Sequence, residues 1–133
     1  MNNEQRNALI LYRIDSAKST LQEIPVHIAN GFYKTAMNRM YYACYYMVSA
    51  LLISKGIEAQ THAGVRQMFG LHFVKTSIVP INLGKFYTDL FANRQESDYV
   101  DFVYYDENVL TELYPIALEF IERIELIIRD NDF

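Results

Sequence analysis

Hydrophobic residues recur at helical spacing along almost the whole chain, and residues 33–51 show the pattern most clearly. Steps of four and three residues alternate there, linking Tyr33, Met37, Met40, Cys44, Met47 and Leu51. Such a stripe lies along one side of an α-helix and is typical of the buried seam in a helical bundle. A chain that repeats this pattern is predicted to bury it between helices and not in a β-sheet.

Apolar periodicity and helix-breaking residues divide the chain into five predicted helices. They cover about residues 4–23, 32–54, 61–73, 82–98 and 107–129. Pro25 and then Asn30-Gly31 are predicted to break the first helix, and Pro115 predicts a kink in the last helix or a later start for it. Thr61 and Asn82 are predicted N-caps. A short strand around residues 102–104 has no predicted partner.

The fold class that follows is all-α: an antiparallel up-and-down helical bundle of four to five helices. Residues 1–133 suit a single domain. The one cysteine, Cys44, excludes an intramolecular disulfide framework and indicates a reducing compartment. The N-terminus does not look like a signal peptide, and no apolar run is long enough to span a bilayer. We therefore expect a soluble, cytoplasmic protein without a membrane segment.

Charge is unevenly distributed along the chain. Residues 1–75 contain eight Lys and Arg against four Asp and Glu, a net charge of +4, whereas residues 76–133 contain four against twelve, a net charge of −8. This division argues against nucleic-acid coating of the whole surface. It allows a local basic pocket or docking between surfaces of opposite potential. A solvated acidic last helix would account for most of the negative charge.

The stretch NRQESDYVDF, which begins at residue 93, interrupts the apolar pattern with charge. At 100° per residue, Arg94 and Asp98 continue an apolar stripe, so both are predicted to face the bundle or a cleft at its end. Base before acid is the weaker order for a helical pair, and the helix dipole disfavours an anion near the C-terminus. Two interpretations stay open: a structural ion pair, or a site where Arg94 binds phosphate and Asp98 holds its guanidinium.

A second polar feature lies on the helix predicted for residues 32–54. Arg39, Tyr42 and Tyr46 follow one another on the side roughly opposite the apolar stripe. The tyrosine rings could pack on another helix of the same chain while Arg39 reaches solvent. Alternatively, the three residues form a homodimer face or bind an anion, nucleotide or nucleic acid, because Tyr and Arg are common interface anchors and stack on bases.

No motif predicts a metal site, a cofactor or an activated nucleophile. The sequence has no HExxH, no Cys/His cluster, no phosphate-binding glycine loop and no Gly-x-Ser-x-Gly elbow. Cys44 lies on the apolar stripe and is predicted to pack there. His72 continues the apolar side of the helix over residues 61–73 and is predicted to be a core histidine. His62 stands at a predicted helix start, and His27 lies near Pro25.

Several spaced motifs resemble those of the HEPN superfamily, in particular its small prokaryotic branch often paired with minimal nucleotidyltransferases. The similarity covers about residues 30–100 in detail and the whole chain in helix order. It includes Asn-Arg-x-Tyr-Tyr-Ala, Lys-Gly-Ile-Glu, Thr-His-x-Gly, Phe-Gly-x-His-Phe and Arg-x-x-x-Asp-Tyr. The resemblance implies an up-and-down bundle that commonly dimerises and frequently pairs with such a nucleotidyltransferase as a toxin–antitoxin system.

The resemblance also has implications for the site. Many HEPN proteins look like metal-independent ribonucleases whose Arg is followed, after four to six intervening residues, by a His. Arg94 matches that Arg, but Tyr99, Val100 and Asp101 stand where the His would be, so the His does not transfer. In some paired members the nucleotidyltransferase adenylylates a tyrosine beside the motif. Tyr99, and less well Tyr104, could take that role.

Three functions are compatible with these observations. The favoured one is a non-catalytic HEPN module that binds nucleotide, RNA phosphate or a nucleotidyltransferase antitoxin at an Arg94/Asp98 cleft. The alternative is a metal-independent ribonuclease toxin. In it Arg94 stabilises the scissile phosphate, Asp98 orients it, and Tyr99 or a histidine brought by the fold assists. The third is a purely structural bundle in which the pair acts as an ion lock. The missing motif histidine favours the first function.

Overall fold

The computed structural model describes residues 1–99 and 105–130, except for the side chains of residues 95–99. Its elements are α1 (Asn3–Ala29), α2 (Tyr33–Ser54), α3 (His62–Phe69), the π-helical turn η1 (Gly70–Val74), α4 (Ile81–Tyr99) and α5 (Glu107–Asp130). The described part of the chain contains helices and no strand, which confirms the predicted all-α class. The strand considered around residues 102–104 lies outside the described residues.

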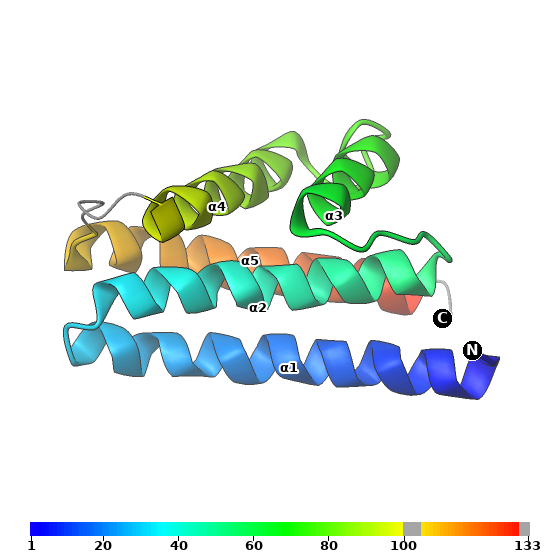
Figure 1. Cartoon of the computed structure of the whole chain (residues 1–133), viewed down its shortest axis with the longest axis horizontal. Helices are drawn as coiled ribbons and strands as arrows, with labels where there is room; N and C mark the ends of the chain where they lie inside the picture. Colours follow the sequence, from blue (N-terminus) through cyan, green and yellow to red (C-terminus); the bar gives the residue numbers. More distant parts are fainter. Residues whose placement is uncertain (100–104, 131–133) are drawn as a thin grey trace.

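Helix α2 is the centre of the bundle, because it contacts each of the other four helices. Figure 1 shows α1, α2 and α5 as long neighbouring helices, with α3 and α4 packed across them on one side. A tight turn joins α1 to α2, and Gly31 adopts a φ of 76° there, a conformation that glycine accepts without steric cost. The start of α1 and the end of α5 lie at the same end of the molecule.

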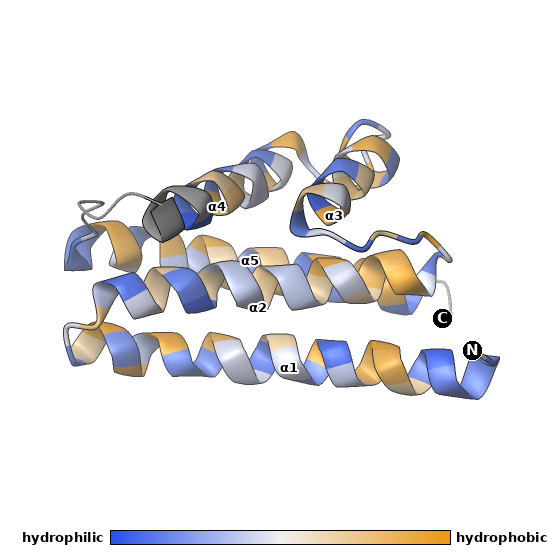
Figure 2. Ribbon diagram, in the orientation of Figure 1, coloured by the Kyte–Doolittle hydropathy of each residue, from blue (hydrophilic) through white to orange (hydrophobic). Residues whose placement is uncertain are grey.

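The apolar stripe of α2 forms the core as predicted. Five of its members are at most 2% exposed: Met37, Met40, Cys44, Met47 and Leu51. Tyr33 is only partly buried. Other sides of α2 are buried as well, including Tyr41 and Val48, because helices cover it from several directions. Hydrophobic and hydrophilic bands alternate along the helices in Figure 2, as this arrangement requires.

The predicted break at Pro25 is wrong, because α1 continues to Ala29 with Pro25 inside it. An interior proline removes one helical hydrogen bond and costs about 3 kcal/mol. Burial of Leu21 and Ile24 on the same helix offsets this cost. The helix ends at Asn30, as the sequence predicts, and the Asn30 backbone N–H and side-chain amide both donate to the Val26 carbonyl.

The predicted burial of His72 is also wrong. After α3 the chain forms the π-helical turn η1, in which the Lys75 N–H donates to the Gly70 carbonyl at 2.8 Å. This wider turn shifts the helical phase, so that Phe73 is 3% exposed while His72 points to solvent. Thr61 does cap α3, and its Oγ1 accepts from the Gly64 N–H at 2.9 Å.

The start of α4 differs from expectation, whereas α5 starts at the predicted residue. Helix α4 begins at Ile81, and the Pro80 carbonyl accepts from the N–H groups of Leu83 and Gly84, so Asn82 lies in the first turn and is not the cap. Helix α5 begins at Glu107 and runs through Pro115, so it has no later start. Asp106 stabilises that start by accepting from the Val109 N–H at 2.9 Å.

Candidate functional site

Helix α4 directs Arg94 toward α2. The apolar residues on the preceding turns, Leu83, Tyr87 and Leu90, are at most 1% exposed and fix the rotation of the helix. Arg94 follows one turn later and is half-buried. Its guanidinium carbon lies 5.5 Å from the ring centre of Tyr41 and 5.7 Å from that of Tyr42. These are cation–π distances, so two aromatic faces hold the planar cation.

The aromatic part of the site comes from the Tyr-Tyr-Ala-Cys-Tyr-Tyr segment of α2. Tyr41 is fully buried, whereas Tyr42 and Tyr45 are half-buried. The ring centres of Tyr41 and Tyr45 are 6.0 Å apart, and those of Tyr41 and Tyr42 are 5.2 Å apart. Burial raises the pKa of Tyr41 to about 12, although the charge of Arg94 acts in the opposite direction. Tyr41 therefore stays protonated at neutral pH.

His62, the first residue of α3, lies across the same tyrosines. Its Nδ1 is 2.9 Å from the Tyr41 hydroxyl, and its ring centre is 4.3 Å from that of Tyr45. Burial and the positive charge of Arg94 lower the pKa of His62 below its ordinary value, so its imidazole is neutral at pH 7. Within the described part of the chain His62 makes no second hydrogen bond, which leaves Nε2 available to a ligand.

We call Arg94, His62, Tyr41, Tyr42 and Tyr45 the Arg94 cluster. It combines a fixed guanidinium, a neutral imidazole and the phenol rings of Tyr42 and Tyr45, which are partly accessible. The guanidinium suits a phosphate, the rings suit a nucleobase, and the imidazole can donate or accept one hydrogen bond.

Another arginine borders the Arg94 cluster. The guanidinium carbon of Arg66 on α3 lies 4.9 Å from the ring centre of Phe91 on α4. Phe91 in turn contacts Tyr41, at 6.3 Å between ring centres. Arg66 and Arg94 therefore lie near connected aromatic rings of α2 and α4.

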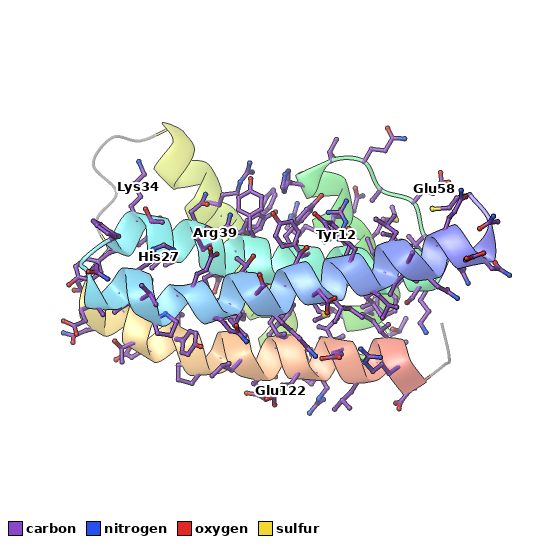
Figure 3. All side chains as sticks on the ribbon, turned by 90° about the horizontal axis from the view of Figure 1, so that it is seen from below. Tyr12, His27, Lys34, Arg39, Glu58 and Glu122 are labelled. Carbon is purple, nitrogen blue, oxygen red and sulfur yellow. The ribbon has the colours of Figure 1, made fainter. Side chains whose placement is uncertain are left out.

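The predicted face of Arg39, Tyr42 and Tyr46 is divided in the structure. Tyr42 belongs to the Arg94 cluster, and Tyr46 borders it at 6.1 Å from Tyr42 between ring centres. Arg39 instead contacts α1: its Nε is 3.3 Å from a Glu23 carboxylate oxygen, and its Nη2 donates to the Thr20 hydroxyl at 3.3 Å. Figure 3 shows Arg39 beside α1, toward the end of the molecule that Lys34 and His27 mark.

Asp98 and Tyr99 occupy the end of α4, but their side chains lie outside the described residues. The predicted pair between Arg94 and Asp98 therefore stays a prediction, as does a role for Tyr99. Val100, Asp101 and Tyr104 are also outside the described residues. Helix phase placed Arg94 correctly with respect to the bundle, because the apolar residues before it set the direction.

The residues that sequence reasoning missed are Tyr41, Tyr45, His62 and Arg66. The Thr-His-x-Gly motif contains His62 and was the sequence signal that could have identified it as a site residue. The spacing between His62 and Arg94 along the chain gave no such signal. The two residues approach each other because the link after Ser54 returns α3 to the side of α2 that α4 covers.

Two other kinds of site receive no support from the residues that the structure describes. They contain no group of three or more His, Cys, Asp or Glu side chains that could hold a metal ion. Cys44 is fully buried, and burial raises the pKa of its thiol, so it packs in the core.

None of the described helices is long and apolar enough to cross a membrane.

Comparison with known proteins agrees with the fold and with the motifs. The HEPN domain matches residues 10–127. A UPF0332 protein of Thermotoga maritima is 36% identical over 126 residues, which cover 95% of this chain and 96% of that protein. Two proteins of Methanocaldococcus jannaschii bear the name "Putative toxin". One is 29% identical over 88% of this chain and 87% of its own length, and the other is 34% identical over 65% and 58%. The chain belongs to the HEPN domain family.

Proposed function

We propose that the chain is the HEPN module of a toxin–antitoxin-type pair and that the Arg94 cluster binds a phosphate group of RNA or of a nucleotide. The names of the two archaeal relatives support the toxin-type role. The partner expected from the HEPN resemblance is a minimal nucleotidyltransferase that acts as antitoxin. The observation that carries the binding proposal is the position of Arg94 on two tyrosine rings beside a neutral His62.

Physical chemistry favours phosphate over other anions at this cluster. A guanidinium held on aromatic faces keeps its N–H fork in one orientation, which suits two parallel hydrogen bonds to phosphate oxygens. The half-buried rings of Tyr42 and Tyr45 offer stacking surfaces for a base attached to that phosphate. A neutral His62 adds a hydrogen bond without adding a second charge.

The test is the affinity for a fluorescently labelled single-stranded RNA, measured by anisotropy at two salt concentrations. Arg94→Gln should weaken binding about tenfold, since a hydrogen bond to a charged group contributes about 1.5–3 kcal/mol. The slope of log K against log salt should also fall by about 0.7. Arg123→Gln, which removes an exposed cation on α5, is the matched control. Equal affinity of the Arg94→Gln and wild-type proteins would exclude the site.

A second candidate function is metal-independent RNA cleavage, and the position of His62 favours it. The fold brings this histidine to Arg94 although the sequence motif lacks one nearby. Nε2 of His62 would take the proton of the ribose 2′-hydroxyl as the 2′-oxygen bonds to phosphorus. Arg94 would stabilise the added charge. The bond from phosphorus to the 5′-oxygen would break, and that oxygen would leave with a proton from water. The products would be a 2′,3′-cyclic phosphate and a 5′-hydroxyl.

The cleavage candidate predicts a particular pH profile. As a base with a lowered pKa, His62 is neutral above that pKa, so the rate should rise with pH through a value below 6.5 and then level off. His62→Gln should abolish this rise without abolishing RNA binding. RNA binding by the wild-type protein without any cleavage would leave the chain a binding module.

We also propose that the chain forms a homodimer, with Tyr46 at the contact. Tyr46 is half-buried at the border of the Arg94 cluster. Light scattering should give a dimer mass for the wild-type protein and a lower mass for Tyr46→Glu, because a carboxylate at a packed contact is costly. A monomer mass for both proteins would contradict the dimer.

A further inference from the structure

A basic cavity lies beside the Arg94 cluster. It has a volume of about 570 Å³ and is lined by α1, the C-terminal half of α2 and the segment before α3. Arg6, Arg13, Tyr45, Ser49 and Glu58 are among the lining residues. In Figure 3 the labels of Tyr12 and Glu58 mark this end of the molecule, far from Lys34 and His27 at the other end.

Two arginines give the cavity its charge. Arg6 and Arg13 are seven residues apart on α1, so they lie on the same side of the helix two turns apart. The Nε atom of each is buried and has no hydrogen-bond partner. Among the described residues neither arginine takes part in an ion pair. Charged donors that are buried without partners cost free energy, and an anion in the cavity would supply the missing acceptors.

The cavity and the Arg94 cluster share a wall. Tyr45 lines the cavity, and its ring also contacts His62 of the Arg94 cluster, at 4.3 Å between ring centres. The segment that lines the cavity, residues 56–60, leads directly to Thr61 and His62. Tyr45 therefore lies between His62 of the Arg94 cluster and the cavity that Arg13 and Arg6 line.

We propose that this cavity binds a second phosphate of the RNA strand whose first phosphate lies at Arg94, so that the chain recognises an RNA strand and not a single nucleotide. The inference rests on the function proposed above. Tyr45 offers an aromatic face between the two phosphate positions, and Ser49 offers a hydroxyl donor. Glu58 is exposed at the rim and forms no ion pair with either arginine, so the cavity keeps a net positive charge.

The experiment compares four proteins by anisotropy: wild type, Arg94→Gln, the double variant Arg6→Gln/Arg13→Gln, and the double variant Lys34→Gln/Arg123→Gln. The last removes two exposed cations outside the cavity and matches the change in net charge. The ligands are a labelled, 2′-O-methylated RNA of about ten nucleotides, which cannot be cleaved, and labelled adenosine monophosphate. Thermal unfolding of each protein verifies that it is folded.

We expect the Arg6→Gln/Arg13→Gln protein to bind the RNA about tenfold more weakly, with a salt slope reduced by about 0.7, because the contact with one phosphate is lost. Its affinity for adenosine monophosphate should stay that of the wild type, because one phosphate reaches only Arg94. An equal loss of RNA affinity in the Lys34→Gln/Arg123→Gln protein would overturn the inference, since total charge would then explain the effect.

The two proposals fail in different ways. If Arg94→Gln weakens RNA binding and Arg6→Gln/Arg13→Gln does not, the second phosphate site is overturned and the proposed function stands. If only the Arg6→Gln/Arg13→Gln protein loses affinity, the cavity binds RNA and the Arg94 site is excluded. Should the double variant unfold, Arg6→Lys/Arg13→Lys replaces it. Lysine keeps the charge but loses the guanidinium fork that binds a phosphate through two hydrogen bonds, so RNA affinity should again fall, and unchanged affinity would overturn the second phosphate site.

Discussion

His62 illustrates what a single residue gains from the fold. In the sequence it is a histidine after a capping threonine, and nothing there connects it to Arg94. In the structure both contact Tyr41: His62 through the phenol oxygen and Arg94 through the ring face. The direction of Arg94 could be predicted, because the apolar residues Leu83, Tyr87 and Leu90 fix the phase of α4. The position of His62 beside Arg94 could not be predicted from the sequence, because it depends on how the link between α2 and α3 folds back.

At the residue scale, the nearness of these two side chains predicts a change in a pKa. Arg94→Gln should raise the pKa of His62, because it removes a positive charge that disfavours the imidazolium. The pKa of His62 should still lie below its ordinary value in this variant, because burial is the larger cause of the lowering. NMR titration of the histidine ring protons measures this directly. Arg123→Gln is the control, and an identical titration of His62 in the Arg94→Gln and wild-type proteins would show that the charge of Arg94 does not reach the ring.

Among the elements, the passage from α3 into η1 is the one that periodicity predicted least well. Helical spacing over residues 61–73 gave one continuous helix, whereas the chain widens into a π-turn that turns Phe73 inward and His72 outward. Such a turn depends on the packing of both neighbours and has no simple sequence signal. Gly84 on α4 meets this element closely: a Cβ added there would lie 2.8 Å from both Cγ atoms of Val74.

This contact makes Gly84 a sharp test of the packing. Gly84→Ala should destabilise the protein by about 1–3 kcal/mol, because the added methyl group overlaps Val74. Adding Val74→Ala should restore part of the loss, since it removes both contacting atoms. Urea unfolding followed by circular dichroism provides the free energies.

Gly70→Ala is the matched control for Gly84→Ala. A Cβ at Gly70 has no neighbour within 4 Å, and its backbone is helical. Alanine there should leave stability unchanged or raise it by up to about 1 kcal/mol. Equal stabilities of the Gly84→Ala and Gly70→Ala proteins would contradict the close approach of α4 to η1.

For the whole molecule, the sequence determined the helix order and the bundle, because five long amphipathic patterns leave few other ways to bury their stripes. The proline positions led to wrong predictions of where helices end or start, because burial around Pro25 and inside α5 outweighs the local cost of a proline in a helix. The division of charge between the two parts of the chain also has a structural use. Lys18 on α1 pairs with Glu125 on α5 at 2.8 Å, and Arg129 contacts the same carboxylate.

This ion pair predicts a pH-dependent contribution to stability. Burial alone would raise the pKa of Glu125, but hydrogen bonds from Lys18 and Arg129 hold it below its ordinary 4.5. The stabilisation is therefore present above pH 4.5 and is lost as pH falls through the lower pKa of the folded state. Glu125→Gln should cost less than about 1 kcal/mol at pH 7, and the difference from wild type should shrink toward pH 3.

Thermal unfolding across this pH range measures the effect of Glu125→Gln. Glu122→Gln changes an exposed neighbour, labelled in Figure 3, and is the control for the loss of one negative charge. A destabilisation by Glu125→Gln that stays constant down to pH 3 would contradict the ion pair.

The central claim is that an RNA phosphate binds between Arg94 and His62. Its most direct test is the pKa of His62, measured by NMR in the free protein and in protein saturated with 2′-O-methylated RNA. A bound phosphate places negative charge beside the ring and partly neutralises the positive charge of Arg94, so the pKa of His62 should be higher in the complex. A pKa of His62 that is the same in the saturated and the free protein would place the RNA elsewhere and contradict the claim.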